Sequence, residues 1–137
     1  MSEEYKLSRM KNPFMLYNGI EICSISPDGS SLKATITEDS KNPYGMVHGG
    51  LIYTLIDCTA GVTARADEHN YVTQSVNVNY LSNVKDEDAI YTESNVIKRG
   101  KSVVVIHVIV KSESGKLMAD GVVNMHRLAD QTKTSVI

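Results

Sequence analysis

Two glycines and one acidic residue mark the stretch 42–57, which reads NPYGMVHGGLIYTLID. Gly49 and Gly50 precede a mostly apolar run that predicts a helix over 51–64, and they leave its first N–H groups without covering side chains. These groups carry the positive end of the helix dipole, so they can bind an anion or a developing oxyanion. Asp57 is the only charged side chain between residues 49 and 64. Because desolvating a carboxylate is costly unless it is hydrogen-bonded, Asp57 is either a satisfied structural group or a reactive one.

Alternation of apolar and polar residues predicts six strands around this helix, at 21–26, 32–36, 71–81, 89–98, 102–111 and 117–128. Turn-forming sequences lie at 27–29, 85–88, 99–101 and 113–116, so the last four strands are expected to form an antiparallel meander. The helix is apolar over most of its circumference and is expected to be buried nearly all round. Together these elements predict an α+β domain in which a curved antiparallel six-stranded sheet wraps around one long central helix.

Two of these strands carry more specific predictions. In 71–81, strict alternation puts Val72, Val76 and Tyr80 on one face of the strand and Thr73 on the other. In 103–110, apolar residues occupy both parities apart from His107. This pattern predicts a strand that is covered on both faces, in the middle of a sheet or at a subunit contact.

Length and composition limit the class of protein. The 137 residues suit a single domain over 1–137, with an N-terminal helical segment at 1–18, whose helix stops at Asn12-Pro13, and a flexible tail at 129–137. No apolar run is long enough to span a membrane, and a formal charge of −2 offers no basic face to nucleic acid. The N-terminus lacks the features of a secretory signal, so a cytoplasmic location is expected.

The cysteines and the scattered histidines show no pattern of metal ligands. Cys23 and Cys58 lack a CxxC spacing and are expected to be buried free thiols. His69, His107 and His126 have no metal-ligand spacing. We therefore expect no metal site and no bound cofactor.

Several residues, taken in order, resemble the hotdog-fold acyl-CoA thioesterases of the PaaI-like and human thioesterase superfamily member 2-like group. The matching residues are Asn42, Gly45, His48-Gly49-Gly50, Leu55, Asp57, the sequence VNVNYL at 76–81 and Lys98-Arg99-Gly100-Lys101-Ser102. The resemblance extends over about residues 12–128 and implies the fold that the helix and strand pattern also predicts. It further implies that protomers pair into one continuous sheet, often with two dimers in a tetramer.

Hydrolysis of a thioester requires an oxyanion donor, a positioned water and a base or nucleophile. The N–H of Gly49 is the candidate donor, and Asp57 either activates water or attacks the carbonyl to form an anhydride. The resemblance implies roles for three more residues. Asn42 helps to hold the thioester carbonyl, His48 orients the substrate or stabilises the leaving thiolate, and Thr73 helps to place the attacking water.

Contacts to the rest of the substrate are expected from Gly50 and from the hairpin at 98–101. In the family that the chain resembles, this hairpin lies near the nucleotide part of CoA, so Lys98, Arg99, Gly100 and Lys101 are candidates for binding phosphates. Each candidate also has a purely structural alternative. Asp57 could bond to nearby backbone, His48 could support the loop, the two glycines could allow close helix packing, Asn42 could be a turn residue, and the hairpin cations could aid solubility.

The spacing of Gly49 and Asp57 has a consequence for assembly. The two residues are eight positions apart, which along a helix rising ~1.5 Å per residue is about 12 Å. One reacting carbon cannot touch both from the same chain. If two helices pack antiparallel across a two-fold axis, Asp57 of one protomer faces Gly49 of the other, so a homodimer with shared active sites is expected.

These inferences predict a cytoplasmic acyl-CoA thioesterase, dimeric and by resemblance tetrameric, that acts on an aryl or a medium to long acyl-CoA. The alternative from another class is a non-catalytic acyl-CoA-binding or sensing module on the same fold. Such a sensor is expected to need an output domain, for which 137 residues leave no room. A hotdog dehydratase would need an Asp/His pair of different spacing. The residues do not specify the acyl group, or CoA rather than a carrier protein.

Overall fold

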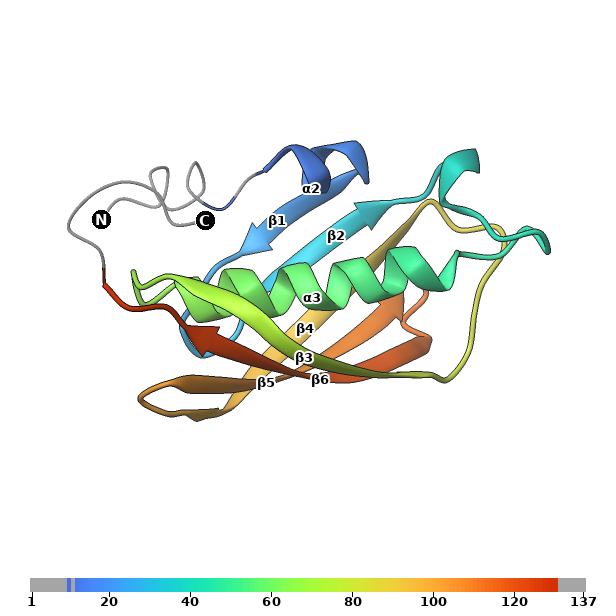
Figure 1. Cartoon of the computed structure of the whole chain (residues 1–137). Coiled ribbons are helices and arrows are strands. Elements are labelled where there is room, and N and C mark those ends of the chain that lie inside the picture. The colour runs from blue at the N-terminus through green and yellow to red at the C-terminus, as the bar shows by residue number, and fades with distance from the viewer. Residues whose placement is uncertain (1–9, 11, 131–137) are drawn as a thin grey trace.

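The structure is a computed structural model that describes Met10 and residues 12–130 of the chain. Its antiparallel sheet has the strand order β1-β2-β4-β5-β6-β3. The strands are β1 (Ile20–Ser24), β2 (Ser31–Thr35), β3 (Tyr71–Tyr80), β4 (Ala89–Arg99), β5 (Val103–Ser112) and β6 (Leu117–Arg127). The long helix α3 (Gly49–Arg65) lies across one face of this sheet, and the short helix α2 (Pro13–Tyr17) lies beside β1 (Figure 1). The predicted hotdog architecture, a curved six-stranded sheet around one long helix, is confirmed.

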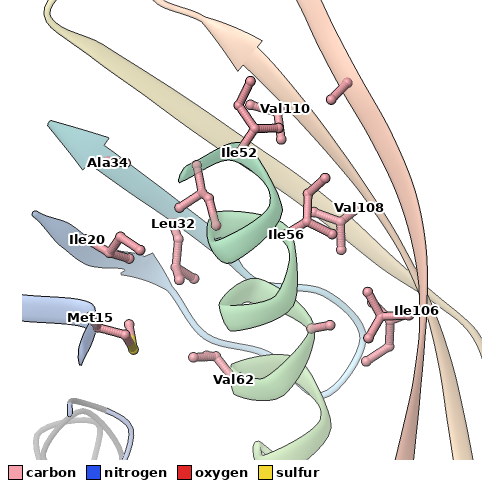
Figure 2. Close-up of a cluster of buried hydrophobic side chains, with 14 of the residues drawn as sticks. Met15, Ile20, Leu32, Ala34, Ile52, Ile56, Val62, Ile106, Val108 and Val110 are labelled. Atoms are coloured by element: carbon pink, nitrogen blue, oxygen red, sulfur yellow. The ribbon is translucent and has the colours of Figure 1, made fainter. Parts of the chain in front are cut away.

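The core lies between α3 and the sheet. Every second residue of β5 from Val104 to Val110 is fully buried, as are Leu55 and Ile56 of the helix. In Figure 2, Ile56 points toward Val108 of β5. Burying an aliphatic side chain of this size contributes about 1.5–3 kcal/mol relative to leaving it exposed, so these contacts fix the height of α3 above the sheet. None of the helices in the described part of the chain is long and apolar enough to cross a membrane.

The predicted meander of four strands is wrong in one place. β4, β5 and β6 are consecutive hairpin neighbours, as expected, and Gly115 takes a φ of 89° in the turn between β5 and β6. β3, however, pairs with β6 at the edge of the sheet, so 85–88 is a crossover and not a hairpin. The turn-forming sequence indicates only that the chain changes direction. It does not identify the strand that lies beside β3, which here is β6.

The prediction that the helix is buried nearly all round is wrong for a single chain, in which one side of α3 is partly exposed. Gly50 and Tyr53 are exposed, and Asp57 and Cys58 are half-buried. These residues form one flank of α3, which we call the open flank. The hydropathy of the helix does not distinguish burial against the chain's own sheet from burial against another molecule, so the sequence alone could not locate this flank.

Near the N-terminus, Asn12-Pro13 begins a helix where the sequence predicted an end. The Asn12 side chain caps α2 by accepting a hydrogen bond from the Met15 N–H at 2.9 Å, and Pro13 takes the first helical position. Pro is tolerated there because that N–H has no partner inside the helix. The helix expected before residue 12 lies outside the described residues apart from Met10, as does most of the tail expected at 129–137.

Two further expectations about burial are corrected. Cys23 is exposed on β1, while Cys58 is half-buried, and both are free thiols. β5 does lie in the middle of the sheet, but within the described chain only its helix side is fully covered. On the other side, Val105, His107 and Ile109 remain half-buried.

Candidate active site

The first turn of α3 is held by His48. Its backbone is extended, with φ −66° and ψ 133°, and its Nδ1 accepts a hydrogen bond from the Gly50 N–H at 2.8 Å. Because Nδ1 is the acceptor, the neutral imidazole carries its proton on Nε2 and can donate it outward. A Cβ on Gly50 would lie 3.0 Å from Nδ1, so glycine leaves room for the ring. The Gly50 N–H, expected to contact substrate, is therefore already engaged by His48.

The Gly49 N–H differs from its neighbour, because within the described residues it has no acceptor. The carbonyl of Gly49 accepts a hydrogen bond from the Tyr80 hydroxyl at 2.9 Å. The peptide unit between Gly49 and Gly50 is thus fixed at its oxygen by Tyr80 and at its N–H by His48. Burial, with a smaller effect of Tyr53, raises the pKa of Tyr80, which keeps its hydroxyl a donor.

Tyr80 is a residue that the sequence did not single out for the site. Its ring lies against the helix start, where a Cβ on Gly49 would be 3.3 Å from the ring. Alternation along the strand put Tyr80 on the same face as Val76, and in the structure that part of the face is turned toward α3. No local signal could identify Gly49, 31 residues earlier, as its partner.

Asn42 shapes the loop that leads into α3. Its Oδ1 accepts hydrogen bonds from the N–H groups of Tyr44 at 2.9 Å and Met46 at 3.0 Å. The oxygen is thereby used within the loop, as the structural alternative expected. Its Nδ2 has no acceptor among the described residues and is the part of the amide that can donate to a ligand.

Thr73 lies on the opposite face of its strand from the one predicted, because β3 contains a bulge. The register between β3 and β6 shifts between Thr73 and Ser75, which leaves one extra residue in β3. Thr73 pairs with buried Met125 and so faces the helix, whereas Val72 is 37% exposed. Strict alternation cannot predict this change, since one inserted residue reverses the parity of all positions before it.

The bulge brings Thr73 to Asp57. Thr73 Oγ1 donates a hydrogen bond to Asp57 Oδ1 at 2.7 Å. The carboxylate is half-buried on the open flank, and among the described residues its Oδ2 accepts no hydrogen bond. This pair is a candidate acid or base whose orientation is fixed by a neighbouring hydroxyl.

A pocket opens beside this pair, between α2, α3, β3 and β6. Its lining includes Asn12, Phe14, Met15, Asp57, Cys58, Gly61, Arg65, Tyr71, Val72, Thr73 and Met125. Burial and the adjacent Asp57 carboxylate raise the pKa of Cys58 to about 11. The thiol is therefore protonated at neutral pH, and Asp57 is the better candidate nucleophile or base in this pocket.

The hairpin at 98–101 differs from the expectation. The Arg99 guanidinium is engaged inside the chain, where it donates to the carbonyls of Pro27 (2.8 Å), Thr63 (3.0 Å) and Ala64 (3.1 Å), to Asp67 Oδ2 (2.8 Å) and to the Tyr71 hydroxyl (3.4 Å). The predicted phosphate contact of Arg99 is corrected accordingly, because its donors satisfy the C-terminal carbonyls of α3. Gly100 closes the turn, donating its N–H to Val103. Lys98 and Lys101 are exposed.

Asp67 is held ionised by the same network. Burial acts to raise its pKa, but hydrogen bonds from the Tyr71 hydroxyl and the His69 N–H, together with the charge of Arg99, hold the pKa of Asp67 below its ordinary value. The network joins the end of α3 to the beginning of β3. It therefore sets the distance between the helix that carries Asp57 and the strand that carries Thr73.

The candidate residues form two groups in one chain. His48 and Gly50 line a surface pocket at the start of α3, whereas Asp57 and Thr73 line the pocket between α2, α3 and β3. No group of three His, Cys, Asp or Glu side chains within residues 10 and 12–130 is arranged to hold a metal ion. A single chain does not bring Gly49 and Asp57 to one point.

Comparison with known proteins identifies relatives of this chain. Residues 44–119 match the family model of the thioesterase superfamily. Acyl-coenzyme A thioesterase 13 of Mus musculus is 27% identical over 105 aligned residues, and the match covers 74% of this chain and 75% of that protein. The E. coli PaaI protein from the phenylacetic acid degradation operon has a TM-score of 0.84 at 19% identity, covering 93% and 97% of the two chains. A hypothetical thioesterase of Streptococcus pneumoniae TIGR4, solved with coenzyme A, has a TM-score of 0.77 at 22% identity, covering 85% and 94%.

Proposed function

The chain belongs to the thioesterase superfamily and is a thioester hydrolase, and from this premise we propose that its substrate is an acyl-CoA, cleaved to the free acid and CoA. The observation that carries the proposal is the Thr73–Asp57 hydrogen bond on an open helix flank, together with a helix start whose Gly49 N–H has no acceptor in the described chain. A curated relative named as an acyl-CoA thioesterase supports CoA as the carrier of the acyl group.

In the proposed reaction, Asp57 acts as a general base. It takes a proton from a water that the Thr73 oxygen helps to hold, and the water oxygen bonds to the thioester carbon. The carbonyl oxygen becomes an oxyanion, which the Gly49 N–H and the Asn42 amide stabilise. The carbon–sulfur bond then breaks, Asp57 returns the proton to the leaving CoA sulfur, and the Nε2–H of His48 stabilises that sulfur.

The active unit that we propose is a homodimer with two shared sites, as Gly49 and Asp57 lie about 12 Å apart along one helix. Two features support it. On the open flank, Tyr53 is 43% exposed to solvent, which is unusual for a large side chain on a central helix. Within the described residues, β3 pairs only with β6, so its other edge has unpaired backbone groups that a second β3 could bind.

Lys98 and Lys101 are the proposed contacts of the CoA phosphates. Both are exposed cations on the β4–β5 hairpin, whereas the neighbouring Arg99 is engaged inside the chain. The resulting interaction is electrostatic and solvent-exposed, so it is expected to weaken as salt is added.

The direct test is to incubate the purified protein with a panel of acyl-CoAs and to follow release of free CoA. Turnover of at least one acyl-CoA, with saturable kinetics, supports the proposal. Tight binding of acyl-CoA with no release of CoA by any member of the panel would instead identify a binding module. Acyl-carrier-protein substrates in the same panel test whether the CoA portion is required.

The shared site can be tested with mixed dimers. Gly49→Pro removes the oxyanion N–H at a helix position where Pro is tolerated, and Asp57→Asn removes the base, so each homodimer should be inactive. Refolding the two variants together puts both lesions into one site of each mixed dimer and leaves the other site native. Random pairing makes about half of the dimers mixed, so activity should recover to about a quarter of wild type.

Two controls make this result decisive. Each variant is refolded alone, and circular dichroism verifies that Gly49→Pro folds, since the new ring lies close to Tyr80. If mixed dimers form and the mixture stays as inactive as its components, the two groups do not share a site.

A further inference from the structure

Tyr53 lies midway between the two groups that the proposed reaction needs. Gly49, Tyr53 and Asp57 follow one another at intervals of four residues, so they occupy successive turns of one face of α3. At ~1.5 Å per residue, Tyr53 is about 6 Å along the helix from each of the other two. It is an exposed residue of the open flank. The proposed reaction assigns roles to Gly49 and Asp57 and leaves the large side chain between them without one.

The proposed sharing of sites determines which residue of α3 lies on the two-fold axis. It puts Gly49 of one protomer opposite the partner's Asp57, and the symmetry puts Asp57 opposite the partner's Gly49. Along two antiparallel helices, residue numbers rise in one protomer as they fall in the other. The residue that faces its own copy is therefore the one midway between 49 and 57, which is Tyr53.

The two ends of β3 are bonded to the same two residues of α3. The Thr73 hydroxyl donates to Asp57, and the Tyr80 hydroxyl donates to the Gly49 carbonyl. A partner that brings its Asp57 to Gly49 must therefore bring its Thr73 close to Tyr80. This arrangement is an antiparallel pairing of two β3 strands along the edge of β3 that faces away from β6.

The register with β6 locates the centre of such a pairing in spite of the bulge in β3. The partners of Thr73, Asn77 and Tyr80 on β6 are, in order, Met125, Val122 and Ala119. Asn77 is thus midway between Thr73 and Tyr80 when distance is counted along β6, whose pairing with β5 is continuous over this stretch. Asn77 should therefore face its own copy across the axis on the strand, as Tyr53 does on the helix.

The Tyr53 side chain is directed toward the start of its own helix. Burial and, to a smaller extent, Tyr53 raise the pKa of Tyr80, so the two phenol groups lie within electrostatic range of each other. This direction is usual for an aromatic side chain on a helix, which leans toward the helix N-terminus. Two Tyr53 rings at the axis therefore lean in opposite directions, each into one of the two sites. Offset aromatic rings attract one another and bury a large apolar area.

We propose that Tyr53 packs against its own copy on the two-fold axis of the dimer, and that the two rings form the wall between the two active sites. In the same dimer, Asn77 of β3 faces Asn77 of the partner subunit. The inference rests on the proposed function, which requires Gly49 and the partner's Asp57 in one site. Tyr53 is a positioning residue, because its contact with the partner's Tyr53 holds the helices at the separation that joins these two groups.

The position of the axis is tested with single cysteines in a Cys23→Ser, Cys58→Ala background, which lacks the native thiols. Directly opposite residues of an antiparallel pair have Cα atoms ~4.5–5.5 Å apart, within the range of a disulfide. Asn77→Cys should therefore oxidise with copper phenanthroline to a covalent dimer on a non-reducing gel. Asn79→Cys alone should not, because two residues from the axis its Cα lies ~13 Å from its copy. Refolded together with Ser75→Cys, it should form a mixed covalent dimer.

The contact itself is tested by substitutions of Tyr53. Tyr53→Glu puts two like charges opposite each other on the axis, so the dimer dissociation constant should rise at least ~10²-fold in analytical ultracentrifugation. Where this variant is monomeric, turnover of acyl-CoA should be lost, since one chain does not join Gly49 to Asp57. Tyr53→Phe keeps the ring and should retain both the dimer and kcat. Ile97→Glu, which adds the same charge at an exposed position of β4, is the matched control and should remain dimeric.

The outcomes separate this inference from the proposed function. If Asn77→Cys fails to cross-link, or Asn79→Cys cross-links with itself, the axis lies elsewhere and the inference is wrong, whereas hydrolysis of acyl-CoA is unaffected. A Tyr53→Glu variant that remains a fully active dimer also overturns it. If Asn77→Cys cross-links and Tyr53→Glu dissociates but no acyl-CoA in the panel is hydrolysed, the proposed function fails while the Tyr53 contact stands. The cysteine test depends neither on activity nor on the folding of Tyr53→Glu.

Discussion

The start of α3 gets its polar contacts mainly from residues nearby in sequence, whereas Asp57 in the middle of the helix and the carbonyls at its end are bonded by residues of distant strands. His48 bonds to Gly50, two residues away, and Asn42 bonds to the loop that it begins. Asp57 is oriented by Thr73, sixteen residues away, and Arg99 reaches partners 28 to 72 residues away. Tyr80, 31 residues from Gly49, is the exception at the helix start.

This difference shows which substitutions should disturb which half of the site. The helix start, with His48, Gly49 and Gly50, depends on local backbone conformation, so it should tolerate changes elsewhere in the sheet. The Asp57–Thr73 pair depends on strand register and on the attachment of β3 to the helix, so substitutions far from the pair should alter its geometry. The following variants test that contrast.

The largest effect is expected from Asp57→Asn, which removes the proposed base and keeps nearly the same volume. Loss of a general base typically costs 10²–10⁴-fold, so kcat should fall at least ~10²-fold while acyl-CoA still binds. The release of free CoA by the purified variant at saturating acyl-CoA measures kcat, and circular dichroism checks the fold. Asp120→Asn, which changes a carboxylate bonded to His107 and Asn79 on other strands, is the matched control. Near-normal kcat in Asp57→Asn would remove this residue from the mechanism.

Arg99→Gln should mainly lower stability, because it breaks the network that joins the end of α3 to β3. With hydrogen bonds to charged groups worth about 1.5–3 kcal/mol, the free energy of unfolding should fall by about 2–3 kcal/mol in urea at matched protein concentration. Lys98→Gln, which neutralises the exposed neighbouring cation, should change it little. A stable Arg99→Gln with a raised KM for acyl-CoA would restore the phosphate contact that the sequence predicted.

The same variant has a predictable dependence on pH. Since the folded-state pKa of Asp67 is lowered, its contribution to stability is present above the ordinary carboxyl pKa and is lost as the pH falls through the lowered value. Removing Arg99 brings this pKa closer to its ordinary value. The difference in stability between wild type and Arg99→Gln should therefore shrink as the pH falls through that range.

Thr73→Val tests the bulge in β3. It removes the hydroxyl that donates to Asp57 at nearly constant volume, so kcat should fall ~10-fold, the equivalent of about 1.4 kcal/mol. Thr73→Ser retains the hydroxyl and should restore most of the activity. Equal activity of the valine and serine variants would show that the hydrogen bond has no part in turnover.

The smallest effect is expected from Tyr80→Phe at the start of α3. This change keeps the ring against Gly49 and removes only the hydrogen bond to its carbonyl, which is worth about 1 kcal/mol, so kcat should fall ~5-fold with KM unchanged. His48 still holds the same peptide unit, which limits the loss. Tyr71→Phe, which also loses a hydroxyl but at Asp67, is the control and should affect stability more than kcat. A Tyr80→Phe variant with full kcat would show that His48 alone suffices.

Much of the helix start could be read from the sequence. Two glycines after a histidine and before an apolar run determine where the helix starts, and the turn residues determine the loop before it. In the described chain only the Gly49 N–H of this pair lacks an acceptor, because His48 accepts from Gly50. These features depend on backbone preferences over a few residues, which are the same in most surroundings. The six strands, the single helix and the β4–β5–β6 hairpins were likewise determined locally.

The tertiary structure decided the features that depend on residues far apart in the chain. The bulge that turns Thr73 toward Asp57, the position of β3 beside β6, and the engagement of Arg99 by the end of α3 all follow from how strands and helix pack together. An alternating pattern defines the two faces of a strand but not its register with the next strand. Likewise, the sequence around a cation in a hairpin does not show whether its side chain faces solvent or the carbonyls of a helix end. Packing resolves both, because buried carbonyls need donors and a curved sheet must close around its helix.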